Sequence, residues 1–191
     1  MAKQSTFTNM VLTLFIVTLA ASTALGFIYE LTKEPIAEAK LRKKNLAIQQ
    51  VVPEYTNQPN EESYEAEVDG HTITLYPAKK DGELVGVAVS TITNKGFSGE
   101  IRLMVGFQPN GTINNISVLE HAETPGLGDK MEKKKSEWSN QFNNKNPEDF
   151  QLDVKKDGGE VDAITAATIS SRAYCDAVER AYKAFKKGGT Q

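Results

Sequence analysis

The chain has 191 residues, with 22 basic side chains against 25 acidic ones and a formal net charge of −3. No charge occurs between Gln4 and Tyr29, which leaves about 160 residues for a water-soluble domain, enough for one hydrophobic core. A mixed, slightly acidic composition lacks the basic stripe that nucleic acid requires, so no nucleic-acid partner is expected. The single cysteine, Cys175, allows no internal disulfide, and with only two separated histidines, His71 and His121, no metal site is expected.

The first predicted element is a membrane anchor over residues 1–31. Residues 10–29 are apolar or small, and at about 1.5 Å per residue a helix of this length crosses the roughly 30 Å hydrocarbon layer. A cleaved signal peptide is the alternative, because Lys3 and the small residues 20–24 suit one, although the apolar character continues to Tyr29. Basic residues after the anchor favour a cytoplasmic domain by charge count, a rule that governs short loops better than whole domains.

A juxtamembrane helix and connection are predicted over residues 32–60. Apolar residues recur at near-helical spacing over residues 34–52, which predicts an amphipathic helix that Pro53 stops. Residues 53–67 are rich in Pro, Asn, Glu and Ser, and we interpret them as a solvated connection whose acidic residues are only charged surface.

Residues 61–191 are predicted to form one domain, with a core motif region over residues 95–187. Alternating residues over 72–76 and 84–93 flank the turn dipeptide Asp81-Gly82 and predict a hairpin. A second hairpin pairs residues 101–107 with 113–118 around a turn that contains Gly111. The predicted fold class is α+β, a mostly antiparallel twisted sheet with flanking helices.

Three more elements are predicted towards the C-terminus. Residues 130–140 suggest a short surface helix and residues 150–154 a short strand. From about Ser170 to Lys187, apolar residues repeat at spacings of three and four, which predicts a long amphipathic helix. We expect Cys175, on this helix, to be a small core residue.

Two segments stand apart from ordinary core and surface. In residues 121–130, Gly126 and Gly128 lack side chains and can take positive φ, so a flat ligand could approach the main chain; an ordinary tight turn uses the same residues. In residues 162–171, hydroxyls and small residues precede the long helix, where free amides and the helix dipole favour a phosphate. Simple N-capping is the alternative for this second segment.

Together the two segments resemble a known family. Residues 123–130, ETPGLGDK, followed by Asp162-x-x-Thr-Ala-Ala-Thr168, resemble the FMN-binding domain of the G subunit of the Rnf electron-transport complex and of the C subunit of the sodium-pumping NADH:quinone reductase. Residues 96–101, GFSGEI, and the single N-terminal anchor extend the resemblance over most of the chain.

The resemblance implies an FMN joined covalently, through its phosphate, to the Thr168 hydroxyl. Thr165, Ala166 and Ala167 would surround the phosphate, and Asp162 matches the acid that a flavin transferase needs. The family usually has glycine at the position of Ala166, so a positive φ there would be strained.

The loop after the second hairpin would lie beside the isoalloxazine ring. Leu127 is expected on the face of the ring, and Glu123 or Thr124 at its polar edge. The cofactor-binding residues expected in this loop are Glu123, Thr124, Gly126, Leu127 and Gly128. Ser170 and Ser171 are alternative hydroxyls for attachment, and His121 is expected to be a turn histidine.

The resemblance implies an electron-carrying flavoprotein subunit of an ion-translocating ferredoxin:NAD oxidoreductase, without independent turnover. The implied partners are the other subunits and a flavin transferase, and the ion path is expected in those subunits because residues 4–29 carry no charge. The implied location is the cell membrane, single-pass, with the domain on the extracytoplasmic side, against the charge count.

Three alternatives remain. The C-type subunit of the quinone reductase shares the flavin chemistry but is typically a longer chain. A cofactor-free, single-pass binding or assembly module would use Thr165 and Thr168 only as helix caps. An anchored hydrolase has little support, because no Ser, His and acid constellation is visible in the spacing.

Overall fold

A computed structural model describes residues 6–188. Helix α1 spans Phe7–Val51 without interruption, so the two helices predicted for its apolar and amphipathic parts are one. Pro35 lies inside α1 and removes a single backbone hydrogen bond, which the bonds of the flanking turns outweigh. The helix ends two residues before Pro53, as predicted. Within residues 6–188, α1 is the one helix long and apolar enough to cross a membrane.

The chain divides into two compact units, one ending at Lys43 and the other beginning at Lys44. The second unit contains the last two turns of α1, a sheet and helix α2 (Thr168–Gly188). The predicted α+β class, with an N-terminal apolar helix and an antiparallel sheet, is confirmed.

The sheet has five antiparallel strands in chain order. They are β1 (Tyr64–Val68), β2 (His71–Lys80), β3 (Glu83–Gly96), β4 (Gly99–Phe107) and β5 (Ile113–His121). Both predicted hairpins are confirmed: β2 turns into β3 through Asp81 and Gly82, both at positive φ, and Gly111, at φ +85°, lies between β4 and β5.

Strand β1 was missed, because the segment was interpreted as a solvated connection. Glu65 and Glu67 alternate with Tyr64, Ala66 and Val68, so the acidic residues hid a strand with one solvated side. β1 pairs with β2 at the edge of the sheet, where such charges are common.

The predicted surface helix over residues 130–140 and the strand over residues 150–154 are wrong. The structure has three short 3₁₀ helices there: η1 (Gly128–Met131), η2 (Trp138–Phe142) and η3 (Lys155–Asp157). Met131 and Phe142 are fully buried, so this polar segment supplies core residues at irregular intervals. Val154 makes one isolated bridge, to Val161, and burial of alternate residues in an irregular segment produced the strand-like pattern.

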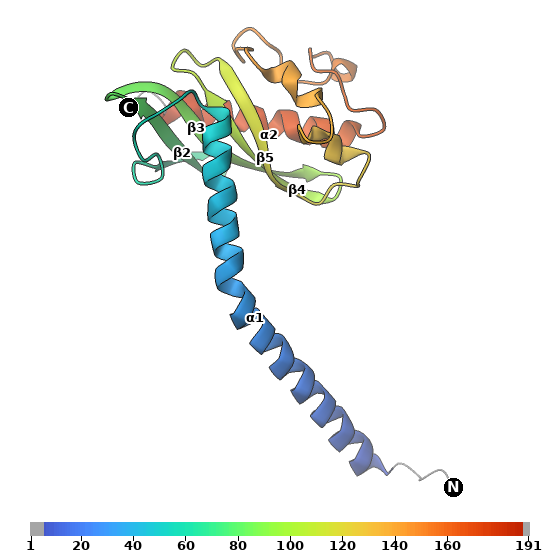
Figure 1. Cartoon of the computed structure of the whole chain (residues 1–191). Helices are drawn as coiled ribbons and strands as arrows, with labels where there is room; N and C mark the ends of the chain where they lie inside the picture. Colours follow the sequence, from blue (N-terminus) through green and yellow to red (C-terminus); the bar gives the residue numbers. More distant parts are fainter. Residues whose placement is uncertain (1–5, 189–191) are drawn as a thin grey trace. The chain divides into compact units, whose positions relative to one another are not determined.

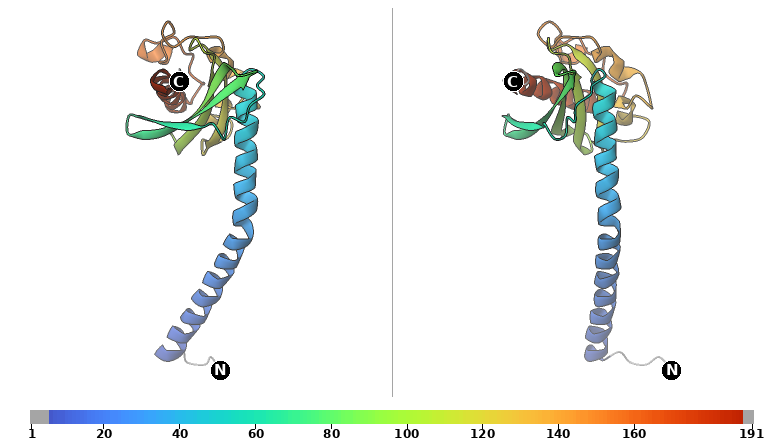
Figure 2. Two further views of the ribbon diagram at one scale, coloured as in Figure 1. Left: turned by 90° about the vertical axis from the view of Figure 1, so that its left-hand side faces the viewer. Right: turned by 60° about the vertical axis from the view of Figure 1, so that its left-hand side comes forward.

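Helix α2 covers one face of the sheet, and residues 44–51 of α1 cover the other (Figures 1 and 2). The core under α2 includes Leu103, Val105 and Phe107 from alternate positions of β4. Met104, between them, faces the opposite cluster with Ile48 and Val51 of α1. The sheet is therefore the middle layer of this unit.

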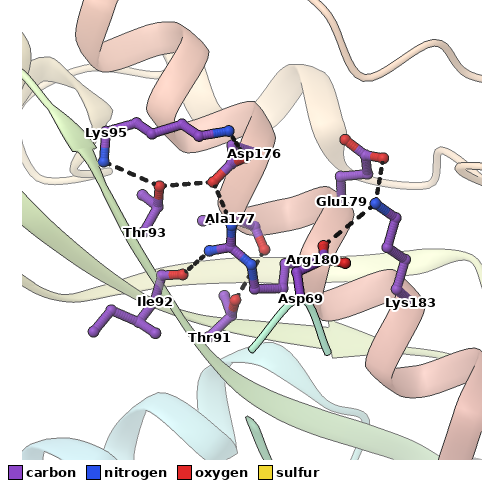
Figure 3. A network of polar contacts seen from close by, with 10 residues as sticks. All are labelled: Asp69, Thr91, Ile92, Thr93, Lys95, Asp176, Ala177, Glu179, Arg180 and Lys183. Carbon is purple, nitrogen blue, oxygen red and sulfur yellow. Dashed lines mark hydrogen bonds and ion pairs between the residues drawn. The ribbon is translucent and has the colours of Figure 1, made fainter. Parts of the chain in front are cut away.

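A polar network joins α2 to β3 (Figure 3). Thr93 Oγ1 donates to Asp176 Oδ2 at 2.7 Å, and Lys95 Nζ donates to Asp176 Oδ1 at 2.5 Å. Arg180 donates to the same Asp176 Oδ2 at 2.9 Å and also to the Ile92 carbonyl. Asp176 thus holds the end of β3 against the helix.

Candidate functional site

A cavity of about 300 Å³ opens where three distant segments meet. These are the turn between β3 and β4, the loop that follows β5, and the entry to α2. The lining residues are Phe97, Glu123, Thr124, Leu127, Gly128, Ala166, Ala167, Thr168, Ile169 and Ser170. The fold therefore brings together the two segments that the sequence singled out.

Thr168 is the first residue of α2 and is half-buried in the cavity wall. The amides of an α-helix's first turn lack intrahelical acceptors, and the helix dipole adds positive potential there. The turn before the helix is closed by Ala167, whose N–H donates to the Ile164 carbonyl at 3.0 Å. Ser171 is buried, and its hydroxyl accepts from the Ile164 N–H at 2.9 Å, so this alternative hydroxyl belongs to the turn and not to the lining.

Ala166 adopts φ +61° at the entry to α2. The other non-glycine residues with positive φ in residues 6–188 are Asp69, Asp81 and Asn144, types that tolerate this conformation. Alanine does not, and the left-handed region costs it about 1–2 kcal/mol. The strain expected from the missing glycine is therefore present beside Thr168.

Glu123 is buried, with 5% of its surface exposed. Its Oε1 accepts from the Ser98 N–H at 2.9 Å, and its Oε2 accepts from the Ser170 hydroxyl at 2.5 Å. Both oxygens are engaged by the protein, whereas Thr124 in the same loop is exposed.

Three large apolar side chains at the cavity are exposed to solvent. Phe97 is 67% exposed, Ile169 47% and Leu127 40%. Leu127 was predicted from the sequence, whereas the other two were missed as site residues. Phe97 could have been found, because it lies in the segment 96–101 that carried part of the resemblance; Ile169 has no signal in the sequence.

The remaining predicted residues lie outside the lining. Thr165 is exposed, and Gly126 makes the turn of its loop at φ +80°. Asp162 is also exposed and pairs with Lys155 at 2.8 Å. Its backbone is held by Gln141, which accepts from the Asp162 N–H at 2.8 Å and donates to its carbonyl at 3.2 Å. The carboxylate therefore faces solvent on a fixed backbone.

The surroundings of His121 and Cys175 are those of residues with a structural role. His121 Nδ1 accepts from the Glu123 N–H at 3.1 Å, and Nε2 lies 3.0 Å from Glu132, which suits a turn histidine. Burial raises the pKa of the Cys175 thiol to about 12, so this core residue stays protonated and unreactive.

Comparison with known proteins agrees with this geometry. Residues 96–183 match the FMN-binding domain family. The G subunit of the ion-translocating oxidoreductase complex of Erwinia tasmaniensis is 41% identical over 78% of this chain and 75% of its own. The protein of the same name from Salmonella typhi is 39% identical over 85% of this chain and 83% of its own. That of Haemophilus influenzae (strain PittEE) is 39% identical over 80% of this chain and 77% of its own. The chain belongs to this family of G subunits. It is an electron-transport flavoprotein subunit, and the predicted family is confirmed.

The cavity fits FMN in both charge and shape. The start of α2 offers free amides to a phosphate, and Thr168 offers a hydroxyl at the same place. The exposed Phe97, Leu127 and Ile169 offer apolar surface to a flat ring.

Proposed function

We propose that this chain carries electrons within an Rnf-type ferredoxin:NAD oxidoreductase, through an FMN bound by a phosphoester to Thr168. The observation that carries the proposal is the position of Thr168, the first residue of a helix and part of the cavity lining. A phosphoester at this point would place its negative charge on the dipole and free amides of α2. Bound FMN would supply reversible transfer of one or two electrons.

The residues of the chain would hold the two halves of the cofactor differently. Ala166 and Ala167 carry no bulky side chain and would leave the amides of the first turn of α2 open to the phosphate, with the Thr165 hydroxyl nearby. Phe97, Leu127 and Ile169 would shield the ring from water, and Thr124 would face its polar edge. Covalent attachment keeps the cofactor from diffusing away between electron transfers.

Attachment would require a flavin transferase, and the surface around Asp162 suits recognition by one. The Asp162 carboxylate is 70% exposed and forms an ion pair with Lys155, itself 60% exposed. The two hydrogen bonds between Gln141 and the Asp162 backbone fix the position of this residue. We propose that the transferase recognises Asp162 and modifies Thr168.

The apolar part of α1 would anchor the protein beside its partner subunits in the cell membrane. We propose that the domain faces the extracytoplasmic side. Protease added to intact cells should then cut the domain, and protection in intact cells with cleavage in opened cells would reverse the assignment.

The deciding experiment is intact mass and ultraviolet fluorescence of the denatured protein. The full chain would be purified from cells that contain a flavin transferase, beside Thr168→Val and Thr165→Val. We expect a fluorescent band with the added mass of FMN less one water in the wild type and Thr165→Val, and its complete loss in Thr168→Val. Fluorescence that survives in Thr168→Val would move the attachment site, with Thr165 and Ser170 tested next. An unmodified, colourless wild type would favour the cofactor-free module.

A further inference from the structure

The three segments that form the cavity are joined by one buried group, the carboxylate of Glu123. The segments are the β3–β4 turn (residues 96–99), the loop over residues 122–128, and the first turn of α2. Glu123 belongs to the loop, accepts from the Ser98 N–H of the turn, and accepts from the Ser170 hydroxyl of the helix. Its two oxygens therefore connect the loop to each of the other two segments.

Two glycines allow this carboxylate to be enclosed. A Cβ at Gly96 would lie 2.8 Å from Glu123 Oε1, and a Cβ at Gly128 would lie 2.7 Å from Glu123 Oε2 and from Ser170 Oγ. Neither residue has positive φ, so close packing and not backbone conformation requires glycine at both positions. Glu123, Ser98, Ser170, Gly96 and Gly128 form what we call the Glu123 cluster.

The β3–β4 turn has a second attachment on its other side. Lys95, directly before Gly96, donates to Asp176 of α2 at 2.5 Å, and Thr93 donates to the same carboxylate (Figure 3). Phe97 therefore lies between two residues that are each tied to other segments, Lys95 to Asp176 and Ser98 to Glu123. A side chain that is 67% exposed is thus carried by a backbone held at both ends.

We propose that Glu123 is a positioning residue, which fixes Phe97 and Leu127 around the flavin ring without contacting the ring. The inference rests on the proposed function, since it assigns the ring to the cavity that these side chains line. It replaces the expectation that Glu123 meets the polar edge of the ring, because both carboxylate oxygens already accept hydrogen bonds from the protein. Its physical basis is the cost of leaving a buried donor without an acceptor, which the two hydrogen bonds to Glu123 avoid.

The first measurement is time-resolved fluorescence anisotropy of the attached flavin in the full-length protein. In the wild type, the anisotropy should decay only with tumbling of the protein. In Glu123→Ala, a fast component from local motion of the ring should appear, while intact mass shows the flavin still attached. Glu123→Gln keeps an acceptor for the Ser98 N–H and can still bond Ser170, so it should resemble the wild type.

The second measurement needs no flavin. Hydrogen exchange of the Ser98 amide would be compared in full-length Thr168→Val with and without Glu123→Ala. Loss of the acceptor should accelerate exchange about tenfold or more, because this amide bonds to a carboxylate. Glu148→Gln is the matched control, since it weakens an exposed carboxylate pair with Lys186 away from the cavity and should change neither readout.

The outcomes separate the two proposals. A wild type without flavin would overturn the proposed function. Faster exchange of the Ser98 amide when Glu123→Ala is added to Thr168→Val would still support the Glu123 cluster. Unchanged anisotropy and unchanged exchange in Glu123→Ala would overturn the positioning role. If Glu123→Gln shows the same fast anisotropy component and the same faster Ser98 exchange as Glu123→Ala, the positioning role is also overturned. The charge of Glu123, and not its two hydrogen bonds, would then be required. If Glu123→Ala does not fold, Ser170→Ala is the second variant. It removes the bond between Glu123 and α2, so the fast component of flavin anisotropy should appear in it.

Discussion

One face of the sheet is covered by α2 and the other by the last two turns of α1, and the two faces are packed through different contacts. Under α2 the contacts are aromatic: Phe107 stacks on Phe185 at 5.0 Å between ring centroids, and Tyr174 lies 5.2 Å from Phe142. Under α1 the cluster also includes small side chains, with Ala47, Ala78 and Ala88 fully or almost fully buried beside Ile48 and Met104. Aromatic pairs thus contribute to the packing under α2, and buried alanines contribute to the packing under α1.

The approach of α1 is close enough to involve main-chain atoms. A Cβ at Gly106 of β4 would lie 1.9 Å from the Val51 carbonyl oxygen. Asn114 donates to that carbonyl at 2.8 Å, and Asn115 donates to the Gln50 carbonyl at 2.7 Å, so β5 caps the end of α1. The α1 face thus serves attachment, whereas the α2 face leaves the start of its helix open at a cavity. The two faces of one sheet therefore hold the end of the N-terminal helix and the proposed cofactor cavity apart.

The largest expected effects come from neighbouring residues of β4 that point to opposite faces. Leu103→Ala and Met104→Ala each remove a fully buried side chain and should each lower the free energy of unfolding by about 2–5 kcal/mol. Thermal and denaturant unfolding would measure the loss. Hydrogen exchange distinguishes the faces, because Met104→Ala should expose amides of residues 44–51 of α1, whereas Leu103→Ala should act on α2. The same exchange pattern in both variants would contradict independent packing of the two faces.

Gly106→Ala tests the close approach of α1 directly. The added methyl group would meet the Val51 backbone, so we expect a loss of about 1–3 kcal/mol in unfolding free energy, together with release of the end of α1. Gly26→Ala is the control, because no atom lies within 4 Å of a Cβ at that position. Stability that is equal in the two variants would show that α1 can shift without cost.

Ala166→Gly should stabilise the protein, and it acts on the cavity side of the comparison. Glycine accepts φ +61° without the penalty that alanine pays, and part of that gain is offset by its larger chain entropy when unfolded, which leaves about 0.5–1 kcal/mol. Denaturant unfolding beside Ala122→Gly, an exposed loop position without positive φ, provides the measurement and control. A loss of stability in Ala166→Gly would mean that the left-handed turn is not strained.

The smallest expected effect is the loss of stability at low pH that comes from Asp176. Burial works against the charged form of Asp176, but hydrogen bonds from Lys95 and Thr93 and the charge of Arg180 outweigh it and lower the pKa of this carboxyl. Because the pKa of Asp176 is lower in the folded state, the network stabilises the fold fully when the pH is above the ordinary aspartate pKa of about 4. This stability is lost as the pH falls through the pKa of Asp176 in the folded protein. Melting temperature between pH 7 and 2 should therefore fall more steeply for wild type than for Asp176→Asn. Parallel curves would contradict a role for this charge.

Local patterns predicted the elements whose partners are close in sequence. The hairpin around Asp81 and Gly82 and the hairpin around Gly111 were predicted because turn residues with positive φ fix both strands. α2 was predicted because its apolar stripe is long and regular. β1 was missed, since a charged edge strand resembles a solvated loop, and residues 130–154 were misassigned, since burial there follows no helical or strand period.

Sequence by itself determined the N-terminal apolar helix, the hairpins, the long C-terminal helix and the family, because each depends on short spacings or on a motif with a fixed order. Thr168, Ala166 and the loop over residues 123–128 were named in this way. Only the tertiary structure decided that Phe97 and Ile169 line the same cavity, that Ala166 has positive φ, and that both oxygens of Glu123 are engaged by Ser98 and Ser170. The physical reason is that these contacts join residues far apart in the chain, and packing of the whole sheet against α2 brings them together.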